Sequence, residues 1–319
     1  MYDVVALGEL LIDFTYAGKS PDGMRLFEQN PGGAPGNFLT VISKMGLKTS
    51  MIGKVGNDMH GDFLIETLRQ NKVGVEGVVS DNNYFTTLAF VDIAENGERN
   101  FSFSRKPGAD TRIDISEIDK ELLLNTRVFH IGSLSLTDEP AKSTTHKAVD
   151  MAKSAGVIIS FDPNYRASLW GTKDDAVTAI MEMLPKADIL KVSDEEAILL
   201  TGESDYNLAA DRLIQRGPGI VAITLGKDGV FVKKGNEHVV VPGFKVEAVD
   251  TTGAGDSFWG GFVGSMIASG KSIDEFSMDD LREFARYGNA TASICVQRRG
   301  GIPAIPDSSE VRQVLQSII

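Results

Sequence analysis

The segment DTTGAGDSF, residues 250–258, carries residue types that can hold an anion beside an acid. It follows a strand-like run that ends at residues 244–246 and precedes a helix-like run over 257–269. At the start of a helix the backbone N–H groups are unpaired and the helix dipole favours negative charge. Its small residues, which let an anion approach the backbone, are Gly253, Ala254 and Gly255. The segment is therefore suited to a phosphoryl group in transfer.

Asp256 is the acid of this segment. A carboxylate in an anion-binding turn would repel the ligand, unless it accepts the proton of a hydroxyl that attacks the phosphoryl group. A helix N-terminus lowers the proton affinity of such a carboxylate, and phosphoryl transfer needs alignment and charge stabilisation more than a strong base. The alternative is an aspartate that only caps the helix.

A second turn, GGAPGN, lies near the start of the chain and precedes a helix-like run over 38–45. Gly32 and Gly33 let a ligand lie against the backbone, and Asn37 offers a donor and an acceptor to hydroxyl groups. Asp13, which we place at the end of the opening strand, can accept two hydroxyl hydrogens from one sugar. The alternatives are a plain turn with a helix cap and a solvated aspartate.

The composition is typical of a globular protein. Of the 319 residues 42% are hydrophobic and 24% are charged, and the formal net charge of -12 argues against a nucleic-acid surface. Cys295 is the single cysteine, which excludes an internal disulfide and favours a reducing compartment. The N-terminus has no basic start, and no apolar run is long enough to span a membrane, so we expect a cytoplasmic protein.

Strand-like and helix-like patterns alternate over most of the chain. Strands are predicted at 128–131, 157–161, 189–190 and 220–225, and helices at 139–154, 174–184, 194–200 and in the tail from 279 to 319. Such alternation is typical of an α/β fold, in which a mostly parallel sheet is flanked by helices. We expect residues 1–319 to form a single domain.

Two regions, at about 10–30 and 84–105, interrupt this alternation with the period of two that half-buried strands show. Asn96 and Gly97 mark a hairpin within the second region. Neither region is long enough to fold alone, so we expect them to combine into a small β-sheet that serves as a lid over the main domain.

The two turns, in this order and near opposite ends of the chain, resemble the two signatures of the ribokinase-like, or PfkB, family of carbohydrate kinases. The resemblance extends over essentially the whole chain. It implies an enzyme that transfers the γ-phosphoryl group of ATP to a sugar hydroxyl, with Mg²⁺ as cofactor. It also implies that Asp256 accepts the proton, that the N–H groups of residues 253–256 hold the phosphoryl group, and that the protein pairs through its lid as a homodimer.

Residues 161–166 are similar to a segment that fructokinases and 2-keto-3-deoxygluconate kinases place near the phosphates and the sugar. This similarity assigns Asn164 to the nucleotide and Arg166 to the acceptor. The alternative is a structural segment, because Pro163 keeps the residue before it extended and ends the strand.

Residues 191–196 correspond to a family segment whose usual form is Asn-x-x-Glu, and here Ser193 replaces the asparagine. The resemblance assigns Lys191 and Ser193 to the nucleotide and Glu196 to Mg²⁺ through water. The alternative is that the acidic residues cap the following helix.

Residues 224–229 look like the nucleotide loop of the family, and Asn289 matches a residue that borders the adenine. The loop residues assigned to the nucleotide are Thr224, Gly226 and Gly229. The alternatives are a hairpin turn and a surface asparagine. Asp250 and Thr252, with carbonyl groups of residues 298–301, match a monovalent-cation site, which implies K⁺ as a further cofactor.

The acceptor sugar depends on side chains of the lid and the strand ends. Phe103 and Arg105 lie two residues apart on the last expected lid strand and so share one face. If that face meets the cleft, Arg105 and Arg166 bind either several hydroxyl groups or a carboxylate. A 2-keto-3-deoxygluconate kinase needs such cations, whereas the strand ends look most like bacterial fructokinases. We favour fructose; the keto acid is one alternative, and a noncatalytic sugar- or nucleotide-binding regulator is another.

Overall fold

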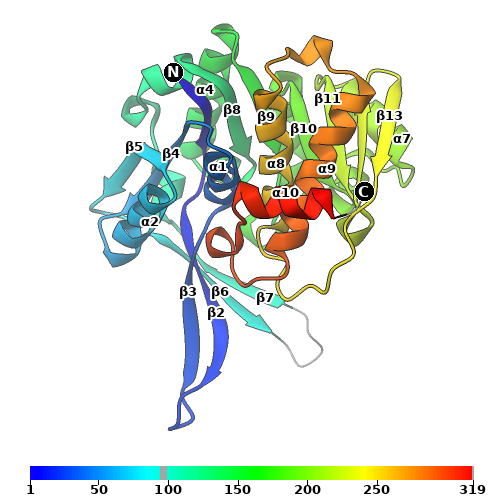
Figure 1. Ribbon diagram of the computed structural model, residues 1–319. Helices are drawn as coiled ribbons and strands as arrows, with labels where there is room; N and C mark the ends of the chain where they lie inside the picture. Colours follow the sequence, from blue (N-terminus) through cyan, green and yellow to red (C-terminus); the bar gives the residue numbers. More distant parts are fainter. Residues whose placement is uncertain (94–98, 318–319) are drawn as a thin grey trace.

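The main β-sheet has its strands in the order β13-β12-β11-β10-β9-β8-β1-β4-β5. The computed structural model, shown in Figure 1, describes residues 1–93 and 99–317. The strands of this sheet are β1 (Tyr2–Leu7), β4 (Thr49–Gly56), β5 (Val73–Asp81), β8 (Thr126–Gly132), β9 (Ile158–Asp162), β10 (Ile189–Ser193), β11 (Ile220–Thr224), β12 (Val230–Lys234) and β13 (Glu237–Val241). β12 is antiparallel to both of its neighbours, and the other neighbouring strands are parallel.

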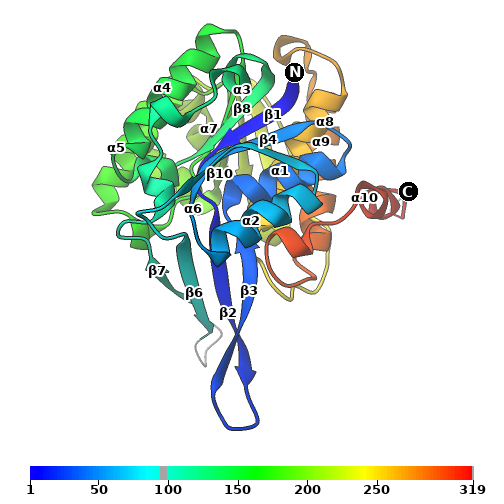
Figure 2. The ribbon, with the colours of Figure 1, turned by 90° about the vertical axis from the view of Figure 1, so that its left-hand side faces the viewer.

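Helices cover both faces of this sheet, as Figures 1 and 2 show. One face packs against α3 (Lys120–Leu124), α4 (Ala141–Ser154), α5 (Lys173–Met183), α6 (Asp194–Thr201) and α7 (Tyr206–Ile214). The other packs against α1 (Ala34–Lys44), α2 (Met59–Gln70), α8 (Ala254–Ala268) and α9 (Met278–Cys295), and α10 (Ser308–Gln316) lies on α9. The predicted α/β fold is confirmed. Among the described helices, none combines the length and the apolar composition that a membrane crossing needs.

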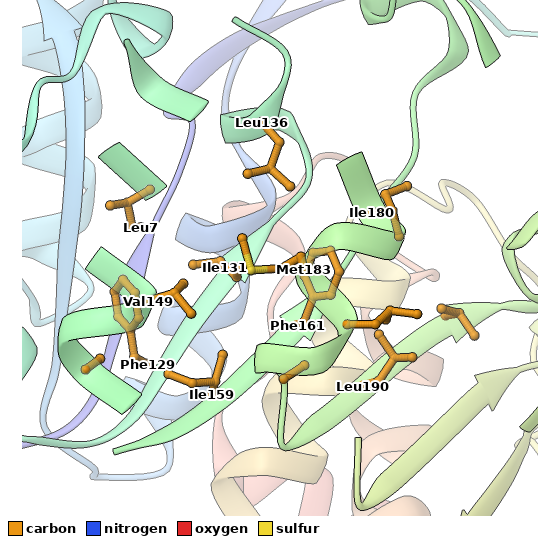
Figure 3. Packing of buried hydrophobic residues seen from close by; sticks show 14 of the residues in the cluster. Leu7, Phe129, Ile131, Leu136, Val149, Ile159, Phe161, Ile180, Met183 and Leu190 are labelled. Carbon is orange, nitrogen blue, oxygen red and sulfur yellow. The ribbon is translucent and has the colours of Figure 1, made fainter. Parts of the chain in front are cut away.

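Successive residues of the central strands enter two different cores, because side chains alternate along a strand. Val5 of β1 packs in the core beneath α4 and α5, whereas Val4 packs in the core beneath α1 and α8. Figure 3 shows the first core, in which Phe161 of β9 meets Met183 of α5. Burial on both faces explains why these strands read as continuous apolar runs in the sequence.

A second, small sheet projects away from the main one (Figures 1 and 2). Its strands lie in the order β3-β2-β6-β7, with β2 at Leu11–Lys19, β3 at Arg25–Gly32, β6 at Thr87–Ile93 and β7 at Arg99–Ser104. β2 is antiparallel to β3 and parallel to β6, so the sheet joins two segments that α1, β4, α2 and β5 separate in sequence. The predicted turn at Asn96 and Gly97 lies outside the described residues.

The strand predicted to end at residues 244–246 is absent at that position, where the described chain has no regular secondary structure. The strand that precedes the 250–258 segment is β13, and it ends at Val241. Pro242 follows and lacks the N–H group that a sheet ladder requires. Asn289 Nδ2 donates to the carbonyl oxygens of Val241 and Pro242, at 3.1 Å each, and so fixes the chain where it leaves the sheet.

The prediction that Asp13 ends the opening strand is wrong. β1 ends at Leu7, and Asp13 lies in β2, opposite Asn30 of β3 and Ala89 of β6. Residues 10–12 are apolar and buried, so they continue the hydrophobic pattern of β1 past its real end. The periodic signal therefore merged two strands that belong to different sheets.

Candidate active site

A cleft of about 930 Å³ lies between the carboxyl ends of the parallel strands and the small sheet. Residues that end or follow β9, β10 and β11 line one wall, and residues of β2 and β7 line the other. The predicted site residues that line it are Asp13, Gly33, Asn37, Phe103, Asn164, Arg166, Lys191, Ser193, Glu196, Thr224, Gly226, Thr252, Gly253, Ala254, Gly255 and Asp256. Within the described chain, the predicted residues outside its lining are Gly32, Arg105, Gly229, Asp250 and Asn289.

Gly253 starts the turn into α8 with a φ of 74°, a left-handed conformation that glycine adopts without strain. The Ala254 N–H donates to the Thr251 carbonyl oxygen at 3.2 Å, so this group is engaged within the turn. Gly255 and Asp256 lie in the first turn of the helix, where N–H groups lack a helical partner. The predicted anion hole of residues 253–256 therefore loses one of its donors to the turn itself.

Asp256 connects the turn at residues 250–258 with the GGAPGN turn near the start of the chain. Its Oδ2 accepts a hydrogen bond of 2.8 Å from Asn37 Nδ2, across a separation of 219 residues. The N-cap of α8 is Gly253, and the helix has no side-chain capping bond, so Asp256 does not act as a helix cap. The arrangement places a carboxylate and an amide side by side at the wall of the cleft.

Burial raises the pKa of Asp256 above its ordinary value, although the hydrogen bond from Asn37 and the charges of Lys191 and Arg166 act to lower it. The prediction that the helix N-terminus lowers the proton affinity of this group is therefore wrong in its net direction. Loss of contact with water outweighs the favourable donors and cations, because desolvation penalises the charged form. The result is a carboxylate better able to take up a proton.

Lys191, in the middle of β10, and Asp162, at the end of β9, form a buried ion pair, with Nζ at 2.9 Å and 3.2 Å from the two carboxylate oxygens. Burial acts to lower the pKa of Lys191, but the carboxylates of Asp162 and Glu196 raise it overall, so the ammonium stays charged. A Cβ placed on Gly255 would lie 3.0 Å from Nζ. A fixed cation therefore lies beside the first turn of α8, where an anion would be held.

Glu196 and Ser193 form a capping box at the start of α6. Ser193 Oγ accepts a bond of 3.1 Å from the Glu196 N–H, and Glu196 Oε2 accepts one of 2.7 Å from the Ser193 N–H. Glu196 Oε1 accepts a further bond of 2.6 Å from the Tyr165 N–H. The capping alternative thus holds, although both side chains also line the cleft. Each carboxylate oxygen keeps a lone pair that can accept from water.

Gly32 and Gly33 pack where a side chain would not fit. A Cβ on Gly32 would lie 2.3 Å from Asp13 Oδ2, and one on Gly33 would lie 2.4 Å from the Glu9 carbonyl oxygen. Gly33 also has a φ of 108°, which L-residues rarely adopt. The turn therefore brings backbone directly against Asp13, at the end of the cleft that the small sheet covers.

Glu9 is a cleft residue that the sequence analysis missed as a site residue. Its side chain is buried, and Oε1 accepts a hydrogen bond of 3.0 Å from the Ala34 N–H, so it caps the start of α1. Burial raises the pKa of Glu9 to about 7 and that of Asp13 to about 7. The available signal was an acid two residues after an apolar strand, a position that is equally typical of a solvated loop.

Arg105 does not join Phe103 in the cleft. Its guanidinium is buried, where Nε donates to Asp110 Oδ2 at 2.8 Å, Nη1 to Thr137 Oγ1 at 2.9 Å and Nη2 to the Leu134 carbonyl oxygen at 2.8 Å. The Arg105 guanidinium therefore lies outside the lining of the cleft, where it was predicted to bind the acceptor. Alternation along a strand predicted one face for Phe103 and Arg105, but β7 ends at Ser104, so the rule does not extend to Arg105.

Residues 224–229 form the turn between the antiparallel strands β11 and β12, so the hairpin alternative holds for their backbone. Thr224 and Gly226 of this turn line the cleft, whereas Gly229 packs against the end of β13. Asn289 is buried rather than exposed, and its amide serves the chain that leaves β13.

Asp250 is buried, and its two oxygens accept backbone N–H groups from Thr252 at 2.8 Å and Gly300 at 3.1 Å. This carboxylate therefore ties the 250–258 segment to the loop after α9. Among the described residues, no group of three or more His, Cys, Asp or Glu side chains could hold a metal ion. His130 is buried against Phe38, with ring centroids 3.9 Å apart.

Comparisons with known proteins place this geometry among sugar kinases. Residues 1–308 match the model of the pfkB family carbohydrate kinases. A probable fructokinase-5 of Arabidopsis thaliana is 39% identical, over 98% of this chain and 97% of that protein. A fructokinase of Xylella fastidiosa, solved with bound ATP, is 30% identical with a TM-score of 0.89, over 99% of each chain. A fructokinase of Vibrio cholerae, solved with fructose, ADP and calcium, is 29% identical with a TM-score of 0.88, over 98% of each chain.

Proposed function

The chain belongs to the pfkB family of carbohydrate kinases, and we propose that it is a fructokinase that transfers the γ-phosphoryl group of ATP to a hydroxyl of fructose. One observation carries this proposal: the Asn37 amide and the Asp256 carboxylate lie 2.8 Å apart in one cleft, beside the start of α8. The pair combines a group that can bind a hydroxyl with a group that can accept its proton. The solved relative that holds both fructose and ADP supports fructose as the acceptor.

In this proposal Asp256 is the base. It accepts the proton of the attacking hydroxyl as the γ-phosphoryl group moves toward the sugar oxygen. The N–H groups of Gly253, Gly255 and Asp256 stabilise the phosphoryl oxygens, with Lys191 as a second source of positive charge. The raised pKa of Asp256 supports the assignment, because it brings the proton affinity of the base nearer to the working pH.

The nucleotide lies along the wall formed by β10 and β11. We assign to it the predicted residues that line this wall, which are Asn164, Lys191, Ser193, Thr224 and Gly226. Mg²⁺ neutralises charge on the phosphates when bound, and Glu196 would hold its water ligands, since this carboxylate lines the same cleft. The K⁺ site at Asp250 and Thr252 stays a prediction.

The sugar lies at the opposite end, under the small sheet. Asp13, Asn37 and Arg166 bind its hydroxyl groups, and Gly33 gives the backbone room for it. Phe103, from β7, packs against the ring face. We propose that the small sheet is the lid of a single catalytic domain and that it excludes water, which otherwise competes as acceptor.

A parallel assay of ATP consumption tests this proposal. We expect turnover with fructose to exceed that with ribose, 2-keto-3-deoxygluconate and adenosine by at least about tenfold in kcat/KM. Product identification by NMR would show which hydroxyl carries the phosphate. Absence of turnover with all of the acceptors, in a protein that binds ATP, would favour the noncatalytic regulator instead.

We also propose a homodimer that forms through the outer face of the lid. Phe14, Tyr16, Phe27 and Phe90 lie on the face opposite Asp13, and their rings contact one another with centroids 5.3 to 6.1 Å apart. Arg25 lies over the Tyr16 and Phe27 rings, but Phe27 and Phe90 are still respectively 37% and 39% exposed, which leaves part of this apolar surface uncovered. A second copy of the chain would bury it.

Phe27→Asp should convert this dimer to a monomer, because a charge in an apolar interface loses its hydration. Multi-angle light scattering of the purified protein measures the mass directly. Leu26→Asp is the matched control, since Leu26 is 46% exposed and points to the other face of β3. Equal masses for both variants and the unchanged protein would contradict the assignment of this face.

A further inference from the structure

We infer that Asp110 sets the acceptor specificity of this cleft by holding Arg105 outside it, so that an uncharged sugar is accepted and a sugar acid is rejected. The inference rests on the proposed function and deepens it. A free guanidinium at the acceptor end would attract a carboxylate, because arginine pairs with carboxylates through two parallel bonds. Asp110 acts through Arg105 and is therefore a positioning residue.

The contacts of Asp110 occupy both of its oxygens. Oδ2 accepts from Arg105 Nε at 2.8 Å, and Oδ1 accepts from Thr87 Oγ1 at 2.5 Å. The two charged side chains are almost fully buried, at 3% exposure for Arg105 and 1% for Asp110. Thr137 Oγ1 and the Leu134 carbonyl oxygen take the remaining guanidinium nitrogens. Each nitrogen of Arg105 therefore has a partner that belongs to the wall and not to a ligand.

Arg105 nevertheless lies directly behind the acceptor end of the cleft. Leu134, whose carbonyl it contacts at 2.8 Å, lines the cleft, and so does Phe103 two residues earlier in the chain. The charge of Arg105 also acts to lower the pKa of Glu9, another cleft residue, although burial raises that pKa overall. A guanidinium released from Asp110 is therefore adjacent to residues that line the acceptor end of the cleft.

The charges that remain at the acceptor end disfavour an anion. Glu9, Asp13 and Asp256 are carboxyl groups in the lining; the charge of Arg166 acts on Asp13, and the charges of Lys191 and Arg166 act on Asp256. With Arg105 withdrawn, Arg166 is the arginine that acts on these acids, and the other cation, Lys191, is already paired with Asp162. A sugar acid would lose the hydration of its carboxylate without the two cations that would compensate for it. An uncharged ketose pays no such penalty, and its hydroxyl groups donate to these carboxylates.

The test compares kcat/KM for fructose with kcat/KM for 2-keto-3-deoxygluconate. In Asp110→Ala the guanidinium loses its fixed anion, and we expect the fructose-to-keto-acid ratio to fall by about tenfold to a hundredfold, through a lower KM for the acid. Adding Arg105→Gln to this variant should restore the ratio, because the lower KM for the acid requires the guanidinium of Arg105. Asp110→Asn keeps the shape of the side chain, so its fructose-to-keto-acid ratio should lie between those of the wild type and Asp110→Ala. It replaces the alanine variant if that one does not fold.

Asp81→Ala is the matched control. Asp81 Oδ2 lies 2.9 Å from Lys54 Nζ in a largely buried pair outside the cleft, so its loss should lower stability without changing the ratio. An unchanged ratio in folded Asp110→Ala or Asp110→Asn protein would overturn the inference, and so would a ratio that stays low when Arg105 is also replaced. Wild-type activity on fructose tests the proposed function separately, because it does not depend on any of these substitutions.

Discussion

Asp256→Asn is expected to lower kcat by about 10²-fold or more while the affinity for ATP stays nearly unchanged. Asparagine keeps the size of the side chain and can still contact Asn37, whose Nδ2 now donates to Asp256 Oδ2 at 2.8 Å. It cannot accept the hydroxyl proton, however. The lost interaction develops mainly in the transition state, so binding in the ground state should change little.

Single-turnover kinetics and calorimetric ATP binding measure the two quantities separately. Asp205→Asn is a suitable control, because Asp205 caps α7 through the Leu208 N–H at 2.9 Å and lies outside the lining of the cleft. If Asp256 only stabilised α8, both substitutions would change the free energy of unfolding and leave kcat unchanged. A turnover within about threefold of the wild type in Asp256→Asn would remove Asp256 from the proposed chemistry.

Lys191→Met should reduce both activity and stability. The ammonium lies 2.9 Å from Asp162 and against Gly255, so its loss removes a charge from the proposed phosphoryl site and leaves a buried carboxylate unpaired. Removal of one partner of a buried pair costs about 3–5 kcal/mol. We expect a loss of this size in the free energy of unfolding at pH 7, together with about a 10²-fold loss in kcat/KM for ATP.

The pH dependence of this variant follows from the remaining carboxyl group. Burial already raises the pKa of Asp162 above its ordinary value, and the loss of Lys191 should raise it further. A group whose folded-state pKa is raised stays protonated while the unfolded chain ionises, so stability falls as pH rises between the two values. The stability deficit of Lys191→Met should therefore be smaller at pH 5 than at pH 8 in denaturant titrations.

The double variant, Lys191→Met with Asp162→Asn, separates the two effects. It removes the unpaired charge, so most of the stability should return, whereas the activity should not. Recovery of activity along with stability would mean that the pair serves only the fold.

The sequence allowed prediction of those parts of the site that depend on local backbone chemistry. The glycines at the start of α8 and the Gly32–Gly33 turn were identifiable, because few residues other than glycine tolerate the conformations and close contacts found there. The α/β fold was equally predictable, since alternating strands and helices leave few topologies. Asn37 and Asp256 were each assigned to a site, and the structure places them in contact.

Features that depend on burial were not predictable in the same way. The direction of the pKa shift of Asp256 follows from its loss of contact with water, which the helix N-terminus alone does not reveal. Arg105 and Asp110 are five residues apart in sequence, yet their pairing depends on a chain reversal after β7 and on contacts with residues 134 and 137. The alternation of side chains applies only within a strand, so it cannot predict this pair.

The parallel pairing of β2 with β6 has a practical consequence for engineering. Each half of the small sheet is encoded in a different stretch of the gene, with α1, β4, α2 and β5 of the main body lying between them. Transplanting this module from one homologue to another therefore means exchanging two cassettes at once, and a chimera with only one of them would carry mismatched edges. New acceptor preferences should for the same reason arise through linked changes in both stretches.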